Sequence, residues 1–198
     1  MAKKAQSTLI NMFLSLTIIA VVAAAALALV SNITAEPIAQ AQKAKKEAAV
    51  KAVLPAFVST QELDIEGTPC TQGLDADGNV TGIAVEAFSD KGFGGRLTAM
   101  VGFDTTGTIT GYQILQTSET PGLGAKAAEW FQQGGKGNVI GKNPSNEPSN
   151  GLKVKKDGGA VDAISGSTIT SRAFCELVNK AFQVVNTISN DQQKGDIE

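Results

Sequence analysis

Apolar residues form one long run near the beginning of the chain. Residues 5–35 carry no charge, and the apolar stretch at residues 10–31 is long enough, at about 1.5 Å per residue, to cross a hydrocarbon core about 30 Å thick. This pattern predicts a transmembrane helix within residues 1–35. A cleaved signal peptide is the alternative, because Lys3 and Lys4 precede the run. The apolar core of a signal peptide has only about 7–15 residues, which favours the membrane helix.

The next segment, residues 36–54, alternates alanine with lysine and glutamine. Proline is tolerated in the first turn of a helix and stops a helix elsewhere, so Pro37 and Pro55 bracket a predicted stalk helix. Lysines lie on both sides of the apolar run, which makes the positive-inside comparison nearly even. Long domains cross membranes largely regardless of their charge, so we expect a cytoplasmic N-terminus and an extracytoplasmic domain.

Alternating apolar and β-branched residues then predict β-strands. The strands are expected at residues 80–87, 97–103 and 108–116, with turns at residues 75–79 and 104–107 and a hairpin loop at residues 92–95. Short turns join antiparallel neighbours, so we expect a meander in a domain that comprises residues 55–198. Behind the strands, the pattern predicts a short helix at residues 125–131 and a second hairpin that pairs residues 152–155 with residues 161–164.

Apolar residues recur at helical spacing near the end of the chain, which predicts a final helix after Ser171. They are Phe174, Leu177, Val178, Ala181, Phe182, Val185 and Ile188. The predicted fold class is therefore α+β, with one N-terminal transmembrane helix and stalk, an antiparallel sheet and a C-terminal helix.

Small and hydroxyl-bearing residues at positions 162–171 lead into this final helix. The first N–H groups of a helix have no partner within it, and together with the helix dipole they favour a bound phosphate. Serine and threonine are also preferred N-caps, so capping alone explains the same residues. The spacing does not decide between the two interpretations.

The composition limits the chemistry of the domain. The chain has 198 residues, a net charge of −2 and no histidine. It therefore lacks the commonest general base and the usual zinc and haem ligand, and it has no basic field for nucleic acid. We expect no catalytic side chain, no metal site and no nucleic-acid partner, so any chemistry must come from a cofactor. Cys70 and Cys175 are too few for an iron–sulfur cluster, and the sequence leaves open whether they form a disulfide.

Residues 162–168, Asp-Ala-Ile-Ser-Gly-Ser-Thr, resemble the flavinylation motif of an FMN-binding domain. That domain is shared by the G subunit of the Rnf electron transport complex and the C subunit of the sodium-translocating NADH:quinone reductase, and the last threonine of its motif carries FMN through a phosphoester bond. The resemblance implies that Thr168 is the covalent attachment site and that Asp162 is part of what the flavin transferase recognises. It also implies cofactor contacts from the residues before Thr168, which are Ser165, Gly166 and Ser167. Ser167 stands where the family usually has alanine.

Residues 119–124, Glu-Thr-Pro-Gly-Leu-Gly, resemble a second signature of the same family, in which the loop lies against the isoalloxazine ring. The resemblance implies polar contacts from Glu119 and Thr120 and an apolar surface from Leu123, with Gly122 in the same cofactor-binding loop. Trp130 fits a packing role better than ring stacking. The two motifs occur in the family's order, so the resemblance covers nearly the whole chain.

A member of this family would be an electron-carrying redox subunit of a membrane-bound, ion-translocating Rnf-type complex, which couples ferredoxin oxidation to NAD⁺ reduction. The resemblance implies covalent FMN, other membrane and redox subunits as partners, and a place in the cell (inner) membrane with the flavin domain outside the cytoplasm. A threonine hydroxyl is a weak nucleophile without an activating base, so attachment should need a separate flavin transferase that uses FAD. The residues alone leave two other functions open, a membrane-tethered non-redox module that binds a phosphate ligand or acts as a scaffold, and a flavoprotein reductase that acts alone.

Overall fold

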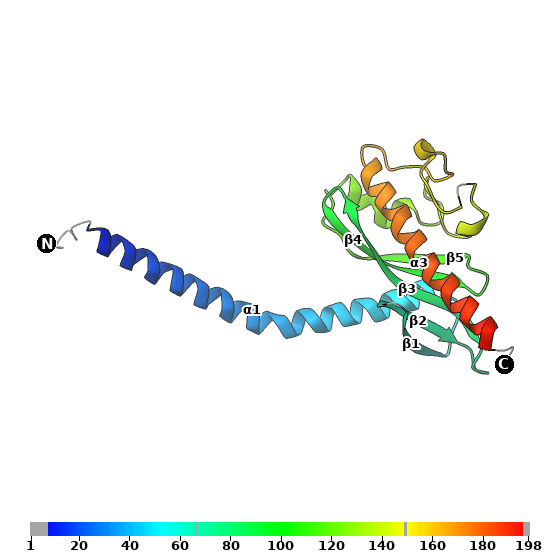
Figure 1. Cartoon of the computed structure of the whole chain (residues 1–198), viewed down its shortest axis with the longest axis horizontal. Helices are drawn as coiled ribbons and strands as arrows, with labels where there is room; N and C mark the ends of the chain where they lie inside the picture. The colour runs from blue at the N-terminus through cyan, green and yellow to red at the C-terminus, as the bar shows by residue number, and fades with distance from the viewer. Residues whose placement is uncertain (1–7, 66, 149, 196–198) are drawn as a thin grey trace. The chain divides into compact units, whose positions relative to one another are not determined.

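The computed structural model describes residues 8–65, 67–148 and 150–195 (Figure 1). The chain forms two compact units, Met1–Ala44 and Lys45–Glu198. Helix α1, Leu9–Val53, begins in the first unit and ends in the second. The sheet and the remaining helices all belong to the second unit.

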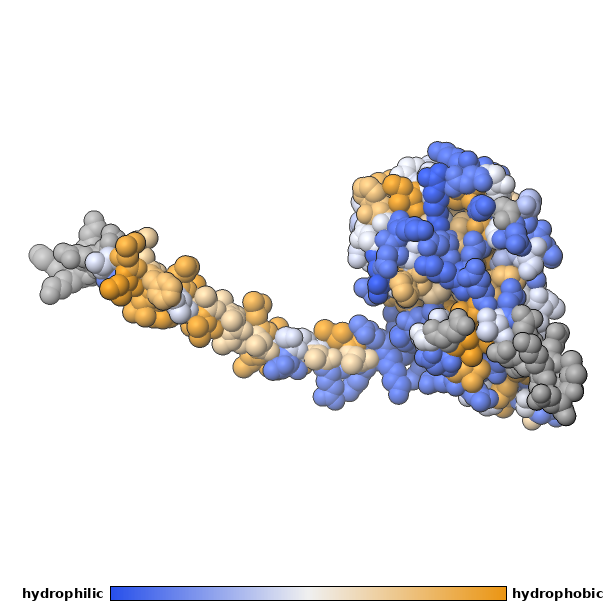
Figure 2. All heavy atoms as spheres, in the orientation of Figure 1, coloured by the Kyte–Doolittle hydropathy of each residue, from blue (hydrophilic) through white to orange (hydrophobic). Residues whose placement is uncertain are grey.

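Within the first unit, α1 exposes large apolar side chains, and Figure 2 shows one apolar face along its N-terminal part. Its hydroxyl groups donate to carbonyl oxygens one turn earlier in the same helix, as Thr17 does to Phe13 at 2.9 Å. Such bonds satisfy polar side chains where no water is present. Of the described residues, those of α1 form the one helix that is long and apolar enough to cross a membrane, which agrees with the prediction from residues 10–31.

The expected stalk does not begin as a separate helix, because α1 continues through Pro37 to Val53. Proline has no N–H, so the hydrogen bond to the carbonyl of Ile33 is missing at this turn while the ladder continues on both sides. The helical prediction for this segment is confirmed, and the predicted helix start at Pro37 is wrong.

The second unit is built on a five-stranded antiparallel sheet in which neighbours in sequence are neighbours in space. The strands are β1 Ser59–Ile65, β2 Thr68–Leu74, β3 Val80–Gly92, β4 Gly95–Asp104 and β5 Ile109–Gln116. Strands β3 to β5 confirm the predicted meander, and Gly92 pairs with Gly95 at the hairpin tip. The apolar pattern does not predict β1 and β2, because β1 is exposed along most of its length and β2 contains Pro69 and Gly73.

Aspartate side chains close two of the turns between strands. The Asp75 carboxylate accepts the backbone N–H of Asn79 at 2.8 Å, and the Asp104 carboxylate accepts that of Thr108 at 2.9 Å. Aspartate commonly stabilises turns in this way. The turns predicted at residues 75–79 and 104–107 are therefore confirmed.

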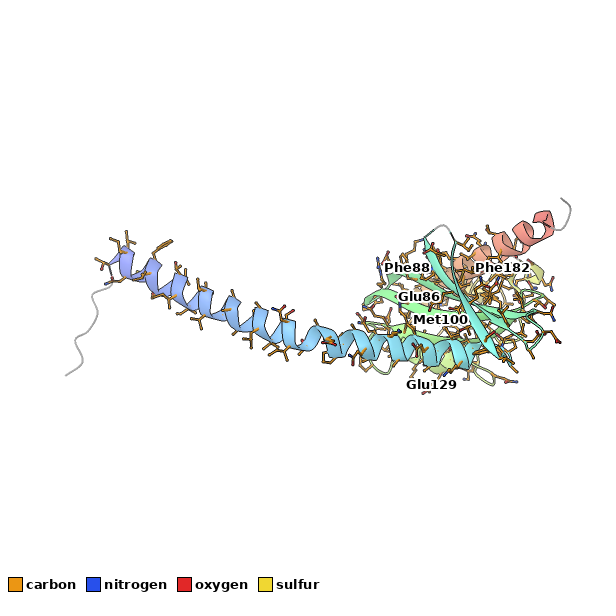
Figure 3. All side chains as sticks on the ribbon, turned by 90° about the horizontal axis from the view of Figure 1, so that it is seen from below. Glu86, Phe88, Met100, Glu129 and Phe182 are labelled. Carbon is orange, nitrogen blue, oxygen red and sulfur yellow. The ribbon has the colours of Figure 1, made fainter. Side chains whose placement is uncertain are left out.

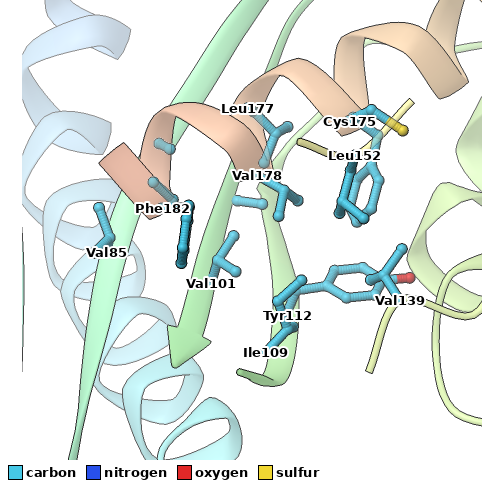
Figure 4. Close-up of a cluster of buried hydrophobic side chains, with 14 of the residues drawn as sticks. Val85, Val101, Ile109, Tyr112, Val139, Leu152, Cys175, Leu177, Val178 and Phe182 are labelled. Carbon is cyan, nitrogen blue, oxygen red and sulfur yellow. The ribbon is translucent and has the colours of Figure 1, made fainter. Parts of the chain in front are cut away.

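Helix α3, Thr168–Gly195, covers one face of the sheet (Figure 4). The apolar residues predicted from the helical spacing are all buried, namely Phe174, Leu177, Val178, Ala181, Phe182, Val185 and Ile188. Tyr112 and Val101 meet them from the sheet, and the rings of Phe174 and Phe131 stack with 4.1 Å between centroids. The final helix is confirmed, although it begins at Thr168 rather than after Ser171.

The last turns of α1, which belong to the second unit, pack on the opposite face of the sheet (Figure 3). Val53 is buried against Met100, and Glu86 on the same face pairs with Lys46 at 2.7 Å. Gly102 allows this close packing, because a Cβ atom there would overlap the backbone carbonyl of Val53. The sheet is thus covered by α3 on one face and by the end of α1 on the other.

Short helices and loops connect β5 to α3. They include η1 Gly124–Lys126, α2 Ala127–Trp130, η2 Pro144–Asn146 and η3 Lys155–Asp157. The first two confirm the short helix predicted at residues 125–131. The predicted second hairpin is wrong, because Val154 and Val161 form only an isolated parallel bridge. The chain turns back through η3 and the left-handed Gly158, with φ of 84°, and this loop replaces the antiparallel ladder.

Candidate functional site

A cavity of about 390 Å³ lies in the second unit, where segments far apart in the sequence meet. Its wall comes from the tip of the β3–β4 hairpin, the loop between β5 and η1, the η3 turn and the start of α3. The lining residues are Phe93, Glu119, Thr120, Leu123, Gly124, Lys156, Gly166, Ser167, Thr168 and Ile169. Small-molecule sites usually have volumes of about 300–1,000 Å³, so the cavity is large enough for a ligand.

The start of α3 is fixed by a tight turn. Gly166 adopts the left-handed conformation with φ of 78°, and the N–H of Ser167 donates to the carbonyl of Ile164 at 2.9 Å. Ser171 ties the turn to the helix, because its hydroxyl accepts the N–H of Ile164 at 2.9 Å and donates to the carbonyl of Ser167 at 3.0 Å. Thr168 is therefore the first residue of α3 and is half-buried in the cavity wall.

The loop between β5 and η1 forms a second part of the wall. The N–H groups of Leu123 and Ala125 both donate to the carbonyl of Thr120, at 3.2 and 3.3 Å, and Gly122 takes the left-handed conformation with φ of 78°. This tight loop presents Leu123 with 46% of its surface exposed, although leucine is usually buried. An apolar side chain held at the rim of a cavity provides a surface for an apolar ligand.

Glu119 is the buried carboxylate of the cavity. Only 8% of its surface is exposed, and its Oε1 atom has no hydrogen-bond partner. Gly92 and Gly124 lie close to the two carboxylate oxygens, so that a Cβ atom at Gly92 would come within 2.8 Å of Oε1. The Thr170 hydroxyl, which is fully buried, also lacks a partner. Native proteins rarely leave buried polar atoms unpaired, so the Glu119 oxygen in the cavity wall indicates a ligand site.

Ion pairs hold η3 beside α3. Arg172 donates to both carboxylate oxygens of Asp157 at 2.7 Å, and these hydrogen bonds hold the pKa of Asp157 below its ordinary range. Lys155 pairs with Asp162 at 2.8 Å. Lys156 lies between these paired residues in the sequence and is the basic side chain of the cavity wall.

Comparisons with known proteins identify the family. An FMN-binding domain matches residues 92–183. The G subunit of the ion-translocating oxidoreductase complex of Methanosarcina acetivorans is 33% identical over 185 residues, which cover 89% of this chain and 94% of that protein. The chain belongs to the family of these G subunits. The G subunit of the Na⁺-translocating ferredoxin:NAD⁺ oxidoreductase complex of Acetobacterium woodii is 33% identical over 193 residues, which cover 89% of this chain and 91% of that protein.

Other similarities cover less of the chain. The G subunit of the ion-translocating oxidoreductase complex of Vibrio vulnificus is 36% identical over 115 residues, which cover 56% of this chain and 52% of that protein. The crystal structure of NqrC from Shewanella oneidensis matches with a TM-score of 0.49 and 23% identity, over 64% of this chain and 61% of that one.

The cavity of this member of the family brings together residues from both predicted motifs. Thr168, Gly166 and Ser167 lie in its wall with residues of the other motif, which are Glu119, Thr120 and Leu123. Three predicted site residues lie outside the lining: Ser165, Gly122 and Asp162. The Asp162 carbonyl accepts the indole N–H of Trp130 at 2.8 Å, so Trp130 packs against the motif at residues 162–168, as the packing interpretation predicted.

The residues present fit FMN. A phosphate can accept hydrogen bonds from the first N–H groups of α3, near Thr168. The ammonium group of Lys156 adds a positive charge in the same cavity wall. A flat, largely apolar ring finds the exposed side chains of Leu123 and Ile169, and its polar edge finds the unpaired oxygen of Glu119. The wall of the cavity therefore combines the apolar and polar groups that a flavin nucleotide needs.

The sequence prediction missed four residues of the wall: Phe93, Gly124, Lys156 and Ile169. Phe93 stands in the glycine-rich hairpin loop, whose glycines indicated only a turn. Its ring has 72% of its surface exposed, which is unusual for an aromatic side chain. An aromatic residue at the tip of a polar hairpin was the available signal for a binding role.

The other candidate chemistry of the chain is limited. Cys70 and Cys175 are free, buried thiols. Burial raises the pKa of Cys175 to about 12, which keeps it in the unreactive thiol form. Among residues 8–65, 67–148 and 150–195, no cluster of three acidic or cysteine side chains could hold a metal ion.

Proposed function

We propose that this chain is a membrane-anchored electron carrier of an Rnf-type, ion-translocating oxidoreductase complex, with FMN esterified through its phosphate to Thr168. The cavity carries this proposal, because one wall contains residues of both motifs. Relatives named as subunits of ion-translocating oxidoreductase complexes support the redox role. The bound flavin supplies the electron-transfer chemistry, and the protein holds and tunes it.

The phosphate belongs at the start of α3. Thr168 is the first residue of a long helix, where N–H groups without helical partners and the helix dipole stabilise an anion. Gly166 and Ser167 lie beside it in the cavity wall, and the exposed Ser165 borders the same turn. Lys156 adds a positive charge from the opposite segment.

The isoalloxazine ring belongs between the hairpin tip and the loop after β5. Phe93, Leu123 and Ile169 expose 72%, 46% and 49% of their surfaces at the cavity, and a bound ring would cover them. Glu119 and Thr120 supply polar groups on the same wall. Gly122 contributes through the loop, since its positive φ lets the chain turn there.

Attachment needs a second protein. The chain has no histidine to activate the Thr168 hydroxyl, so we assign this step to a flavin transferase that uses FAD. The threonine O–H bond breaks and its oxygen forms the new bond to the FMN phosphorus, the pyrophosphate bond of FAD breaks, AMP leaves, and the hydroxyl proton passes to solvent water. Asp162 lies near the surface, paired with Lys155, where a transferase can recognise it.

The apolar part of α1 anchors the chain in the cell (inner) membrane, with the N-terminus in the cytoplasm and the flavin domain outside. Covalent attachment suits this location, because a dissociated cofactor would be lost to a large volume. Other membrane and redox subunits of the complex are the electron donor and acceptor.

Mass spectrometry and gel fluorescence test the attachment. The full chain, made together with a flavin transferase, should carry the added mass of FMN less one water and should keep flavin fluorescence in a denaturing gel. Thr168→Ala should lose both signals. Thr170→Val is the matched control, because Thr170 lies in the same helical turn but is buried and outside the cavity lining.

The outcomes separate the alternatives. Fluorescence of the denatured Thr168→Ala chain, or its loss only in Thr170→Val, overturns the assignment to Thr168. A wild-type chain that binds no flavin at all supports the membrane-tethered phosphate-binding or scaffold module instead. Thr168 is half-buried at the first position of α3, and alanine has a higher helix propensity than threonine, so Thr168→Ala should still fold and reach the membrane.

A further inference from the structure

Glu119 occupies the point where three elements around the cavity meet. Gly92 of β3 lies next to its Oε1 atom, Gly124 of η1 lies next to its Oε2 atom, and Thr170 of α3 lies beside Gly124. A side chain at Gly124 would take the space of the carboxylate, since the added Cβ would lie within 2.8 Å of the Glu119 carboxyl carbon, whereas a Cβ at Gly92 would meet the Gly95 carbonyl first and Oε1 at 2.8 Å. Glu119 is thus enclosed by backbone from β3 and η1, and the start of α3 lies close by.

No cation neutralises this carboxylate within the described part of the chain. The cations on the described residues of these elements are Lys91 of β3, Lys126 of η1, Lys155 and Lys156 of η3, and Arg172 and Lys180 of α3, and the acids beside them are Glu86, Asp90, Asp157 and Glu176. Lys155 pairs with Asp162 and Lys180 pairs with Glu176. Lys91 pairs with Glu176 and Arg172 pairs with Asp157, while Lys126 and Lys156 are exposed to solvent. None of the ion pairs includes Glu119.

An unpaired carboxylate with only 8% of its surface exposed is sensitive to any further negative charge in the same cavity, because the surrounding protein screens charge poorly. Reduction of a bound flavin adds such a charge. We propose that Glu119 is an acid–base group of the site, whose carboxyl takes up a proton when the cofactor gains an electron and releases it when the electron leaves. This inference rests on the proposed function, since it requires FMN in the cavity.

The step balances in charge and atoms. One electron comes from a redox carrier of the complex, or from an electrode in the experiment, and enters the cofactor. One proton leaves solvent water and forms an O–H bond with a carboxylate oxygen of Glu119. Reoxidation breaks that bond and returns the proton. The net charge of the cavity is therefore the same in both states, and Glu119 is itself neither oxidised nor reduced.

The Oε1 atom of Glu119 is available to bind the added proton. Among the described residues Oε1 has no hydrogen-bond partner, so its protonation breaks no hydrogen bond within the protein. Oε1 lies against the hairpin tip, whose strand ends at Gly92, and the cavity opens beside Phe93. A role limited to accepting a hydrogen bond from the ring would need no change of protonation, and this difference is measurable.

Infrared difference spectroscopy of the full flavinylated chain, reduced and reoxidised at an electrode, gives the direct test. The reduced state should show the carbonyl band of a protonated carboxylic acid, shifted in deuterated water. Glu119→Gln should lose the band. Glu129→Gln is the matched control, since Glu129 is an exposed glutamate outside the cavity lining, and it should keep the band.

The pH dependence of the midpoint potential gives a second readout. A tenfold change in proton concentration moves the potential of a one-electron couple by about 59 mV per proton, and of a two-electron couple by about 30 mV. The slope should become shallower by one proton in Glu119→Gln and stay unchanged in Glu129→Gln.

Three results overturn the inference: no acid band in the wild-type chain, the same band in Glu119→Gln, or equal slopes in both chains. If Glu119→Gln does not fold, Glu119→Asp replaces it, and a band that does not move in this variant counts against Glu119. A chain that carries no flavin overturns the proposed function together with this inference. A flavinylated chain without the band overturns the inference alone.

Discussion

Substitutions that remove two neighbouring hydroxyl groups in the first turn of α3 should change the free energy of unfolding in opposite directions. Thr170 and Ser171 are both fully buried. The Ser171 hydroxyl accepts the N–H of Ile164 at 2.9 Å and donates to the carbonyl of Ser167 at 3.0 Å, whereas the Thr170 hydroxyl has no partner. The same type of group is therefore satisfied at one position and unsatisfied at the next.

The expected magnitudes follow from these contacts. Ser171→Ala leaves the buried N–H of Ile164 unpaired, which should lower the free energy of unfolding by about 1–3 kcal/mol. Thr170→Val replaces an unpaired hydroxyl by a methyl group of the same shape. A buried hydroxyl without a partner costs about 1–3 kcal/mol in protein mutants, and valine and threonine have similar helix propensities, so the variant should be more stable than the wild type.

Denaturation of the full, unflavinylated chain in detergent micelles measures both changes. Trp130 is the only tryptophan and lies in the second unit, so its fluorescence reports the unfolding of the sheet domain. The slope of the free energy against denaturant concentration should be equal in all three chains. If Thr170→Val lowers stability as Ser171→Ala does, the Thr170 hydroxyl has a partner in the folded protein, and the reasoning fails.

Two further predictions concern topology and the thiols. A reporter that works only outside the cytoplasm should be active when fused after residue 198, and activity of a cytoplasm-only reporter there would reverse the proposed orientation. Burial raises the pKa of Cys175 to about 12 and that of Cys70 above its ordinary value, so both thiols should resist alkylation at neutral pH until denaturant is added. Rapid labelling of the native chain would contradict the buried positions.

The sequence predicts those elements whose burial follows a regular pattern. Strands β3 to β5 carry runs of apolar and β-branched residues that are largely buried, and α3 repeats its apolar residues at helical spacing, so each pattern reports burial in the core. Strand β1 has no such pattern, because its residues are mostly exposed and it is held by pairing with β2. Its existence follows from a partner strand rather than from its own residues.

The incorrectly predicted second hairpin shows a different limit of prediction from sequence. Residues 152–155 and 161–164 have the composition of strands and flank a glycine-rich turn, yet Val154, Val161 and Ile164 are buried as single residues of a loop. The ion pair between Asp157 and Arg172 fixes the loop from outside, and its partner lies in another element. Local composition cannot show a loop that is held by a distant helix.

The residues of the cavity also fall into a group that the sequence predicts and a group that only the fold reveals. Resemblance assigned Thr168 and the loop at residues 119–124, because each motif is continuous in sequence. Phe93 and Lys156 come from segments with no motif of their own, and only the fold brings them to the cavity. Gly124 ends the second motif, and only the fold shows that its missing side chain leaves room for the carboxylate of Glu119.

The position of Glu119 gives a physical reason for the small residues around the cavity. A glycine at the end of β3 and another at the start of η1 are ordinary turn residues when each is considered alone. In the folded chain both leave room for one carboxylate, which the structure buries without a cation in the described residues. A second negative charge beside a buried carboxylate is unfavourable, and a proton taken up with the electron removes that repulsion. A site that must accept an added electron therefore gains from a group whose charge can be removed at the same moment.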